Sequence, residues 1–292
     1  MATYILYNPH AGNGGGEQEA KRLAPLYTGE VLLQDMTQIG DYKSFLSPLC
    51  ADDTLLICGG DGTLNRFVND TDGLELPSQI LYYAVGTGND FLHDLGKQTG
   101  EGPFAIGEYL RELPFVEVGG KKYRYLNGIG FGVDGYCCEV GDKLKAKSVK
   151  RVNYTAIAIK GLLFHYKPKK ATITVDGVSY TYKKVWIAAA MNGRFYGGGM
   201  MTAPNQDRRN EKGEITLVVM HGSGKLKTLM VFPSIFKGEH VKHEEMVAVH
   251  TGRDITVTFD EPCALQIDGE TVLGVTSYRV SAAKTELAPA PV

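Results

Sequence analysis

The stretch Gly59-Gly60-Asp61-Gly62-Thr63-Leu64-Asn65 follows the apolar run Thr54–Cys58 and leads into a helical pattern at 63–71. Its glycines lack Cβ atoms, so a phosphate group can approach the main chain where N–H groups and the positive end of a helix dipole attract anions. Asp61 is suited to hold Mg²⁺ or to accept a proton, and Thr63 to donate to a phosphate oxygen. Taken alone, the stretch also fits an ordinary strand-to-helix loop in which Asp61-Gly62 turns the chain.

Two more Gly-rich turns follow apolar runs in the same part of the chain. They are Asn8-Pro9-His10-Ala11-Gly12-Asn13-Gly14 and Gly86-Thr87-Gly88-Asn89-Asp90-Phe91. Each has an ordinary explanation by itself, the first as a flexible loop and the second as a helix cap made by Asn89 or Asp90. Neither contains a lysine placed to reach the β- and γ-phosphates, as a G-x-x-x-x-G-K-[ST] loop would. Backbone amides and a metal would therefore have to balance the phosphate charge.

From residue 2 to about 114, strand-like apolar runs alternate with helix-like runs. The predicted strands are 3–8, 30–35, 54–58 and 80–85, and the predicted helices are 17–27, 41–49, 63–71 and 90–95. Alternation of this kind is typical of a parallel sheet with helices on its faces. Ligands bind such sheets at the carboxyl ends of the strands, where all three Gly-rich turns lie. We therefore expect a doubly wound α/β nucleotide-binding domain.

After Pro114 the pattern changes to short strands joined by tight turns, which is typical of an antiparallel β fold. The predicted strands are 115–118, 123–127, 171–175, 179–189, 214–220, 254–259, 264–267 and 271–274, with one helical pattern at Val149–Phe164. We predict two domains, residues 1–115 and residues 116–279, the second mainly antiparallel and β-sandwich-like. The tail at about 280–292 is assigned as a segment able to return to the first domain.

Composition is that of a globular protein that can bury a real core. Hydrophobic residues make up 43% of the chain, charged residues 22%, and the formal net charge is −2. This balance gives no overall attraction to nucleic acid, so no such partner is expected. The apolar runs fall well short of the roughly 20 residues that span a bilayer, and we expect a cytoplasmic protein.

The five cysteines include no C-x-x-C pair, and we expect them to be reduced thiols. We expect His240 and His243 to be exposed and without a metal.

The order N-P-x-A-G-x-G, then G-G-D-G-T-L-N, then G-T-G-N-D-F resembles the diacylglycerol kinase catalytic domain. That domain occurs in bacterial lipid kinases related to sphingosine and ceramide kinases. The resemblance continues in the second half through 127–134, 192–193, 197–200, 203–204 and 266–270. It therefore covers nearly the whole chain.

The resemblance implies a two-domain enzyme that holds ATP in the first domain and the phosphate acceptor in the cleft between the domains. Its implied ATP-binding residues are Asn8, Pro9, Ala11, Gly12, Gly14, Thr37, Gly59, Gly60, Asp61, Gly62, Thr63, Asn65, Thr87, Gly88 and Asn89. ATP and Mg²⁺ are the implied cofactors, with Asp61 as the metal ligand.

The implied catalytic residues are Asp268, Glu270 and Asp61. The first two belong to a D-G-E element that reaches the γ-phosphate region and supplies the general base. Related kinase families use the Asp of G-G-D-G-T as the base, so the proton acceptor is left open. Read locally, residues 264–272 are equally a hairpin with a type I′ turn at Asp268-Gly269.

Three features depart from the family pattern. Arg66 stands where the family commonly has Glu, a charge reversal that could touch phosphate or the partner domain. The family often carries an Asp-Asp-Gly run beyond the Ala-Pro that forms a structural Mg²⁺ site, whereas residues 205–213 here include Arg208 and Arg209, which argues against that site. The first Gly-rich loop contains neither lysine nor arginine.

The expected function is that of an ATP-dependent lipid kinase, which transfers the γ-phosphate to a hydroxyl of diacylglycerol or a similar lipid in phospholipid metabolism. The segment Lys143–Lys170 carries nine basic residues and no Asp or Glu, which fits either a solvated helix face or an anionic membrane surface. We expect a lipid substrate and peripheral contact with the inner membrane surface, with a homodimer left open. The alternatives are an NAD kinase-like enzyme with a soluble acceptor, which this chain fits less well because it lacks an Asn-Asn-Glu element, and a non-catalytic lipid- or nucleotide-binding protein.

Overall fold

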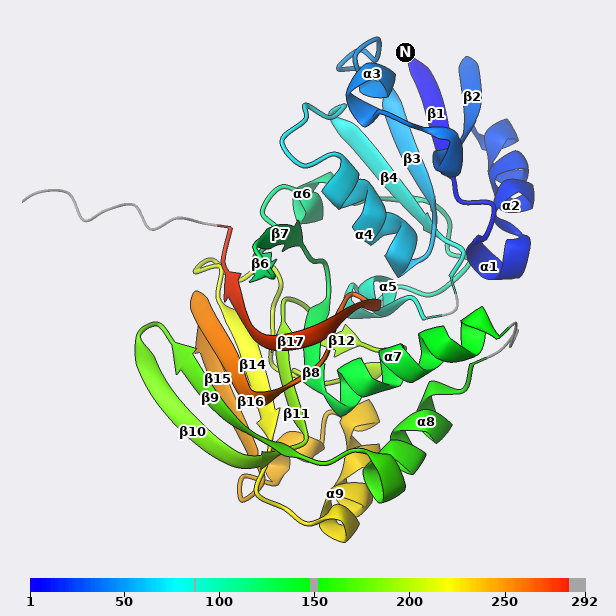
Figure 1. Cartoon of the computed structure of the whole chain (residues 1–292). Helices are drawn as coiled ribbons and strands as arrows, with labels where there is room; N and C mark the ends of the chain where they lie inside the picture. Colours follow the sequence, from blue (N-terminus) through cyan, green and yellow to red (C-terminus); the bar gives the residue numbers. More distant parts are fainter. Residues whose placement is uncertain (87, 148–151, 284–292) are drawn as a thin grey trace, which may run out of the picture. The chain divides into compact units, whose positions relative to one another are not determined.

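The computed structural model describes residues 1–86, 88–147 and 152–283 (Figure 1). The chain divides into two compact units, Met1–Glu112 and Leu113–Val292, which are described separately. The predicted domain boundary at residue 115 stays a prediction. Val280 and Ser281, at the start of the predicted returning tail, pair with Val116 and Phe115 in the second unit, and residues 284–292 lie outside the described residues.

A five-stranded sheet forms the centre of the first unit. Its strand order is β2-β1-β3-β4-β5, and the first four strands are parallel while β5 is an antiparallel edge. The bounds are β1 Ala2–Tyr7, β2 Glu30–Asp35, β3 Thr54–Gly59, β4 Gln79–Ala84 and β5 Phe104–Ala105. The predicted parallel-sheet domain is confirmed. Because the chain moves from β1 to β2 on one side and to β3 on the other, the strand order reverses between β1 and β3, where open sheets bind ligands.

Short helices connect these strands. They are α1 Ala11–Gly14, α2 Gly16–Leu23, η1 Ala24–Leu26, η2 Met36–Gln38, α3 Tyr42–Leu46, α4 Asp61–Asp70, α5 Asp90–Asp94 and α6 Gly107–Leu110. In α4, Leu64, Phe67 and Val68 are buried at helical spacing while Arg66 is exposed. In α2, Ala20 and Leu23 pack with Ile5 and Leu56 of the sheet. These contacts fix the starts of both helices at the carboxyl ends of β1 and β3.

The second unit contains a ten-stranded antiparallel sheet. Its main path is β15-β14-β11-β8-β16-β17-β6-β7, and β9 joins β16 and β10. The bounds are β6 Phe115–Val118, β7 Lys121–Arg124, β8 Gly128–Gly132, β9 Lys169–Val175, β10 Val178–Val185, β11 Ile187–Met191, β14 Ile215–Met220, β15 Val247–Gly252, β16 Asp254–Ile267 and β17 Glu270–Ser281. A separate two-stranded pair is formed by β12 Phe195–Tyr196 and β13 Met200–Met201.

The long strand β16 lets this sheet enclose a core. It pairs with β9 through Ile255–Phe259 and with β8 through Leu265–Ile267, and its register with β17 is irregular around Cys263. Phe259 then stacks on Phe131 of β8, with ring centroids 4.0 Å apart. The same apolar cluster draws residues from β6, β9, β11, β14 and β17. A mainly antiparallel, sandwich-like domain is therefore confirmed.

Three hairpins of the second unit have two-residue turns, as their sequences predict. Gly119-Gly120, Asp176-Gly177 and Asp268-Gly269 all have positive φ at both positions, and the flanking residues pair directly. This is type I′ geometry, which glycine and, more readily than most residues, aspartate adopt. The turn at Asp268 thus fixes the register of β16 against β17.

A layer of helices covers one face of the second sheet around Trp186 and Met191. Its members are α7 Val133–Ala146, α8 Tyr154–Lys160, η3 Gly161–His165, α9 Lys225–Val231, η4 Phe232–Lys237 and η5 His240–Lys242. The predicted helix at 149–164 begins at Tyr154 within the described residues, and residues 149–151 lie outside them. His240 was expected to be exposed, which is wrong, because it is buried and its Nε2 lies 3.0 Å from the Thr202 carbonyl oxygen. Within the described residues, every helix is too short or too polar to cross a membrane.

Candidate active site

The three Gly-rich turns of the first unit meet at the carboxyl edge of its sheet. A Cβ atom on Gly86 would lie 2.8 Å from the Gly60 Cα atom, and one on Gly12 would lie 2.6 Å from Val85 Cγ1. Real Cβ atoms do not come this close, so the backbones approach one another only because these positions are glycines. The loops that the sequence places at three separate strand ends therefore form one continuous surface.

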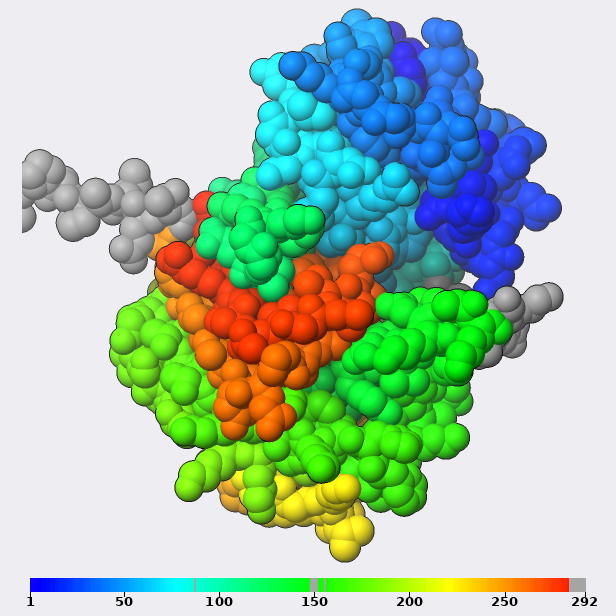
Figure 2. Space-filling model, viewed as in Figure 1, coloured from blue at the N-terminus to red at the C-terminus, as the bar shows by residue number. Residues whose placement is uncertain are grey.

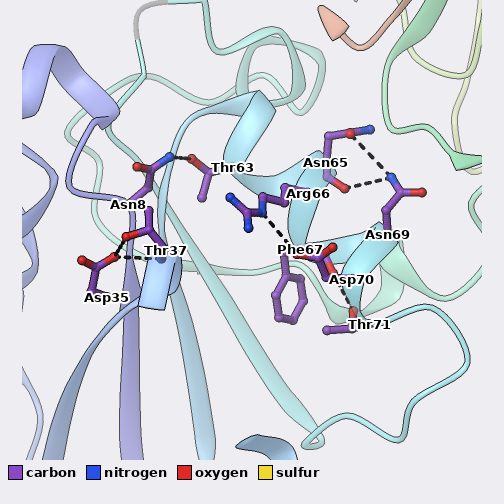
Figure 3. A network of polar contacts seen from close by, with 10 residues as sticks. All are labelled: Asn8, Asp35, Thr37, Thr63, Asn65, Arg66, Phe67, Asn69, Asp70 and Thr71. Atoms are coloured by element: carbon purple, nitrogen blue, oxygen red, sulfur yellow. Dashed lines mark hydrogen bonds and ion pairs between the residues drawn. The ribbon is translucent and has the colours of Figure 1, made fainter. Parts of the chain in front are cut away.

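A side-chain hydrogen bond joins the first loop to the second. Asn8 Nδ2 donates to Thr63 Oγ1 at 3.0 Å, and the two side chains point toward each other from the ends of β1 and β3 (Figure 3). The Asn8 main-chain N–H donates to the Cys58 carbonyl, which continues the β1–β3 pairing by one residue. Because Thr63 is nearly buried, its hydroxyl is held in a fixed position in the first turn of α4.

Asp61 joins the second loop to the third. Its Oδ2 accepts the N–H of Asp90 at 2.8 Å and its Oδ1 accepts the N–H of Phe91 at 3.1 Å. Asp61 thus caps α5 from a distant part of the sequence, a role that local reading gave to Asn89 or Asp90. Asn89 has a left-handed backbone, and its Nδ2 donates to the Gly86 carbonyl and to Thr99 Oγ1.

Backbone N–H groups line the same edge. Gly60 is the N-cap residue of α4 and has no side chain with which to occupy the N–H groups of the first turn, and the first helical bond runs from Leu64 N to Gly60 O. In the first loop, Gly12 and Asn13 both have left-handed φ and ψ, which breaks the helical path there. The start of a helix beside a glycine loop is an arrangement that binds phosphate through backbone N–H groups.

The remaining predicted nucleotide residues lie at or near these loops. Pro9, Ala11 and Gly14 belong to the first loop, Gly59 ends β3, Gly62 lies in the first turn of α4, and Gly88 lies in the third loop. Thr37 follows β2, where its N–H and Oγ1 both donate to Asp35 Oδ1 (Figure 3). Asn65 is buried, and its carbonyl accepts from Asn69 Nδ2. Thr87 lies outside the described residues.

Arg66 pairs with a residue on its own helix. Its Nε lies 3.3 Å from Asp70 Oδ2, one turn further along α4, and its side chain is exposed (Figure 3). An exposed pair of this kind contributes little to stability. The charge reversal at position 66 is therefore balanced locally by Asp70.

In the second unit, Asp268 anchors the β16–β17 turn to the start of β8. Its carboxylate accepts the N–H groups of Leu126, Asn127 and Gly128, and its own N–H donates to the Gly128 carbonyl. Glu270, two residues further on, begins β17 and is exposed. Within the part of the chain that the structure describes, its carboxylate has no hydrogen-bond or ion-pair partner. The structure thus gives the two predicted catalytic carboxylates different surroundings.

Arg208 contacts the same corner of the backbone. Its Nη1 donates to the Leu126 carbonyl at 3.3 Å and its Nη2 donates to Asn127 Oδ1 at 3.1 Å. Arg208 is one of the two arginines that argued, in the sequence, against a structural Mg²⁺ site in this stretch. Among the described residues, no three His, Cys, Asp or Glu side chains gather at one place.

Asp134 is a buried carboxyl that the motif search did not single out. It lies in the first turn of α7, and Gln266 Nε2 donates to its Oδ2 at 3.0 Å. Burial raises the pKa of Asp134 to about 6, against the lowering effect of the Gln266 bond. Gln266 also accepts the N–H of Gly269, so Asp134 is linked to the Asp268-Gly269 turn.

Family models match both units. Residues 2–113 match the diacylglycerol kinase catalytic domain, and residues 127–289 match the YegS C-terminal NAD kinase beta sandwich-like domain. The chain belongs to the diacylglycerol kinase family. It is therefore an enzyme of the kinase class, and the sequence motifs identified its family correctly.

Relatives cover most of the chain at low identity. A diacylglycerol kinase of Mycobacterium tuberculosis is 28% identical over 72% of this chain and 67% of its own length. A diacylglycerol kinase of Bacillus subtilis is 24% identical over 91% of this chain and 88% of its own length. A crystal structure from Bacillus anthracis str. Sterne, 20% identical, covers 96% of this chain and 91% of that one with a TM-score of 0.69, which shows the shared fold.

Sequence reading missed the contacts that organise the site. The bonds from Asp61 to the third loop and from Asp268 to residues 126–128 join positions far apart in the chain, so no spacing rule reveals them. Arg208 was noted only as an obstacle to a metal site. No sequence signal linked it to Asn127, which lies 81 positions away in the chain.

Proposed function

We propose that this protein is an ATP-dependent lipid kinase that transfers the γ-phosphate of ATP to a hydroxyl of diacylglycerol or a similar lipid in phospholipid metabolism. The observation that carries the proposal is the Asp61 contact with the N–H groups of Asp90 and Phe91. That contact joins two glycine turns into one surface of backbone amides, and the Asn8–Thr63 bond adds the third. A surface built this way is suited to a polyphosphate without any lysine.

The proposed nucleotide contacts follow from this surface. The N–H groups at the start of α4 and in the first loop would bind the phosphates, and the Thr63 hydroxyl would donate to a phosphate oxygen. Mg²⁺ fits the same place, because a carboxylate offers about four lone-pair sites and Mg²⁺ is usually bound by one or two carboxylates together with phosphate oxygens. Asp61 would hold the ion, which neutralises phosphate charge when bound.

The two carboxylates of the β16–β17 hairpin would have separate roles. Asp268 uses its oxygens on three backbone N–H groups, so we assign it the positioning of the turn. Glu270 is exposed on the next strand and would accept the proton of the attacking hydroxyl. Transfer itself needs little more than positioning and charge stabilisation, which the amide surface supplies.

A lipid acceptor requires the enzyme to work at a membrane, and we propose peripheral association with the inner membrane surface. The second candidate is an NAD kinase-like reaction on a soluble acceptor, which the NAD kinase-like description of the second domain model favours. Either function predicts the same nucleotide site. The acceptor therefore decides between them.

The test is ATP consumption by the purified chain over diacylglycerol, monoacylglycerol, phosphatidylglycerol, undecaprenol, sphingosine and NAD, each with and without Mg²⁺. Asp61→Asn serves as the inactive control and Asp70→Asn, an exposed carboxylate on the same helix, as the matched active one. Phosphorylation of a lipid supports the proposal. Phosphorylation of NAD alone would replace it with the second candidate, and ATP binding without turnover on any acceptor would favour a binding protein.

A further inference from the structure

The most exposed large apolar side chains of the described residues gather at one place. After Met1, they are Met230 at 75%, Leu226 at 74% and Phe164 at 72% relative exposure. Leu226 and Met230 belong to α9 and Phe164 to η3. These two elements lie against each other, and Lys225 Nζ donates to the Leu163 carbonyl at 2.9 Å. We call Phe164, Leu226 and Met230, with the lysines around them, the α9–η3 tip.

The faces of α9 show why this exposure is unusual. Thr228 and Val231 are buried toward the sheet, as expected for a surface helix. Leu226 and Met230 are four residues apart, so they share the opposite face, where such a helix normally carries polar side chains. Figure 2 shows α9, in yellow, at the end of the second unit with its outer face uncovered. Clustered exposed apolar side chains of this kind mark an interaction surface.

The segments that carry the tip are rich in lysine. Residues 160–170 contain Lys160, Lys167, Lys169 and Lys170, residues 221–237 contain Lys225, Lys227 and Lys237, and neither stretch contains an Asp or Glu. Lys169 and Lys227 form ion pairs with Glu261 and Glu245. Within the described part of the chain, Lys160, Lys167 and Lys237 form none. The tip is therefore both apolar and cationic.

We propose that the α9–η3 tip is the surface by which this protein docks on an anionic lipid bilayer, with Phe164, Leu226 and Met230 inserted and the lysines at the headgroups. The inference rests on the proposed function, since a lipid acceptor places the enzyme at a membrane. Apolar insertion combined with basic residues is what binds peripheral helices to anionic membranes. A second copy of the chain fits the same face poorly, because a two-fold contact would bring the lysines of both copies together.

The proposal places the membrane surface in the later part of the basic segment expected from sequence, whose residues Lys150 and Arg151 lie outside the described residues. Lys143 and Lys145, in the first part of the basic segment, pair with Glu139 and Asp142 on α7. Their charges are neutralised locally and attract lipid less. In the later part of the segment Lys169 pairs with Glu261, but Lys160 and Lys167 form no ion pair among the described residues. This part also has apolar partners on α9, some sixty residues further along the chain.

The test is co-sedimentation of the full chain with phosphatidylglycerol–phosphatidylcholine vesicles and with phosphatidylcholine vesicles. The variant is Phe164→Ser/Leu226→Gln/Met230→Gln, and the matched control is Leu26→Gln/Val178→Thr, which removes exposed apolar side chains elsewhere. We expect the variant to bind anionic vesicles at least about ten-fold more weakly, since each inserted side chain contributes favourably. Lys160→Gln/Lys167→Gln should lose several-fold and weaken the salt dependence of binding.

Activity on detergent-dispersed diacylglycerol separates this inference from the proposed function. The triple variant should keep that activity while losing vesicle binding. Vesicle binding equal to that of the unmodified protein would overturn the docking surface, and so would a change of oligomeric state by light scattering with vesicle binding retained. If the unmodified protein shows no lipid kinase activity in detergent but still needs the tip for vesicle binding, the proposed function fails and the docking surface stands.

Discussion

Asp61 Oδ2 accepts the main-chain N–H of Asp90 at 2.8 Å, although the two residues are 29 positions apart. The contact places the start of α5 against the start of α4, so two helix N-termini face one edge of the sheet. A negative side chain at a helix start stabilises it through the exposed N–H groups and the dipole. The Asp of the G-G-D-G-T element therefore holds the second and third loops together.

Asp61→Asn should abolish phosphoryl transfer and loosen the third loop. We expect turnover to fall by about 10²-fold or more, the scale of a positioned electrostatic group, and unfolding free energy to fall by about 1 kcal/mol as a cap weakens. Steady-state kinetics and thermal melting measure the two effects. Asp70→Asn, which removes only an exposed pairing with Arg66, should change neither. Turnover within a few-fold of the unmodified enzyme would remove Asp61 from the mechanism.

The Asn8–Thr63 hydrogen bond predicts a coupled pair in nucleotide binding. Asn8→Ala should raise the KM for ATP several-fold, because the first loop loses its contact with α4. Thr63→Ser keeps the hydroxyl and should be mild, whereas Thr63→Val removes it while preserving shape. In the double variant Asn8→Ala/Thr63→Val, the loss of ATP-binding free energy should be smaller than the sum of the losses in the two single variants. Strictly additive losses in KM would mean that the two side chains act separately.

Sequence reading predicted most of the first unit because its information is local. Apolar runs gave four parallel strands, and Asp-Gly or Gly-Gly pairs gave three tight hairpin turns, of which only the one at Asp268-Gly269 was predicted as type I′. Helix α9 was not predicted. Leu226 and Met230 place apolar side chains on its outer face, so its sequence lacks the amphipathic pattern by which a surface helix is recognised. The sequence also did not predict the contacts of Asp61, Asp268 and Arg208, because these contacts depend on which loops the fold brings together.

Asp134 predicts a pH-dependent stability. Its folded-state pKa of about 6 exceeds its ordinary value of 3.8, so the folded protein binds a proton that the unfolded chain has released. This contribution is complete below about pH 4 and is lost as the pH rises through 6. The Asp134→Asn variant has no titrating group at this position. Between pH 4 and pH 8, its free energy of unfolding should therefore rise relative to that of the unmodified protein, by about 3 kcal/mol at most.

Chemical denaturation of both proteins at pH 4, 6 and 8 measures that difference, and the comparison cancels the titration of all other groups. Glu75→Gln, which alters an exposed carboxylate, is the control. A difference between Asp134→Asn and the unmodified protein that stays constant with pH would mean that Asp134 has the same pKa in the folded and unfolded states.

Replacement of the two hairpin carboxylates, Asp268 and Glu270, should affect turnover and stability differently. Glu270→Gln changes an exposed side chain without a partner in the described structure, so turnover should fall by about 10²-fold while the melting temperature stays the same. Asp268→Asn replaces the acceptor of three backbone N–H groups, because an amide offers one oxygen where the carboxylate offers two. It should lower both turnover and the free energy of unfolding, the latter by about 1–3 kcal/mol.

ATP affinity should change little in either variant, because the proposed nucleotide contacts lie in the first unit. If Glu270→Gln kept full turnover and only Asp268→Asn were impaired, the proton would have to pass to another group, and the hairpin would act solely by holding residues 126–128 in place.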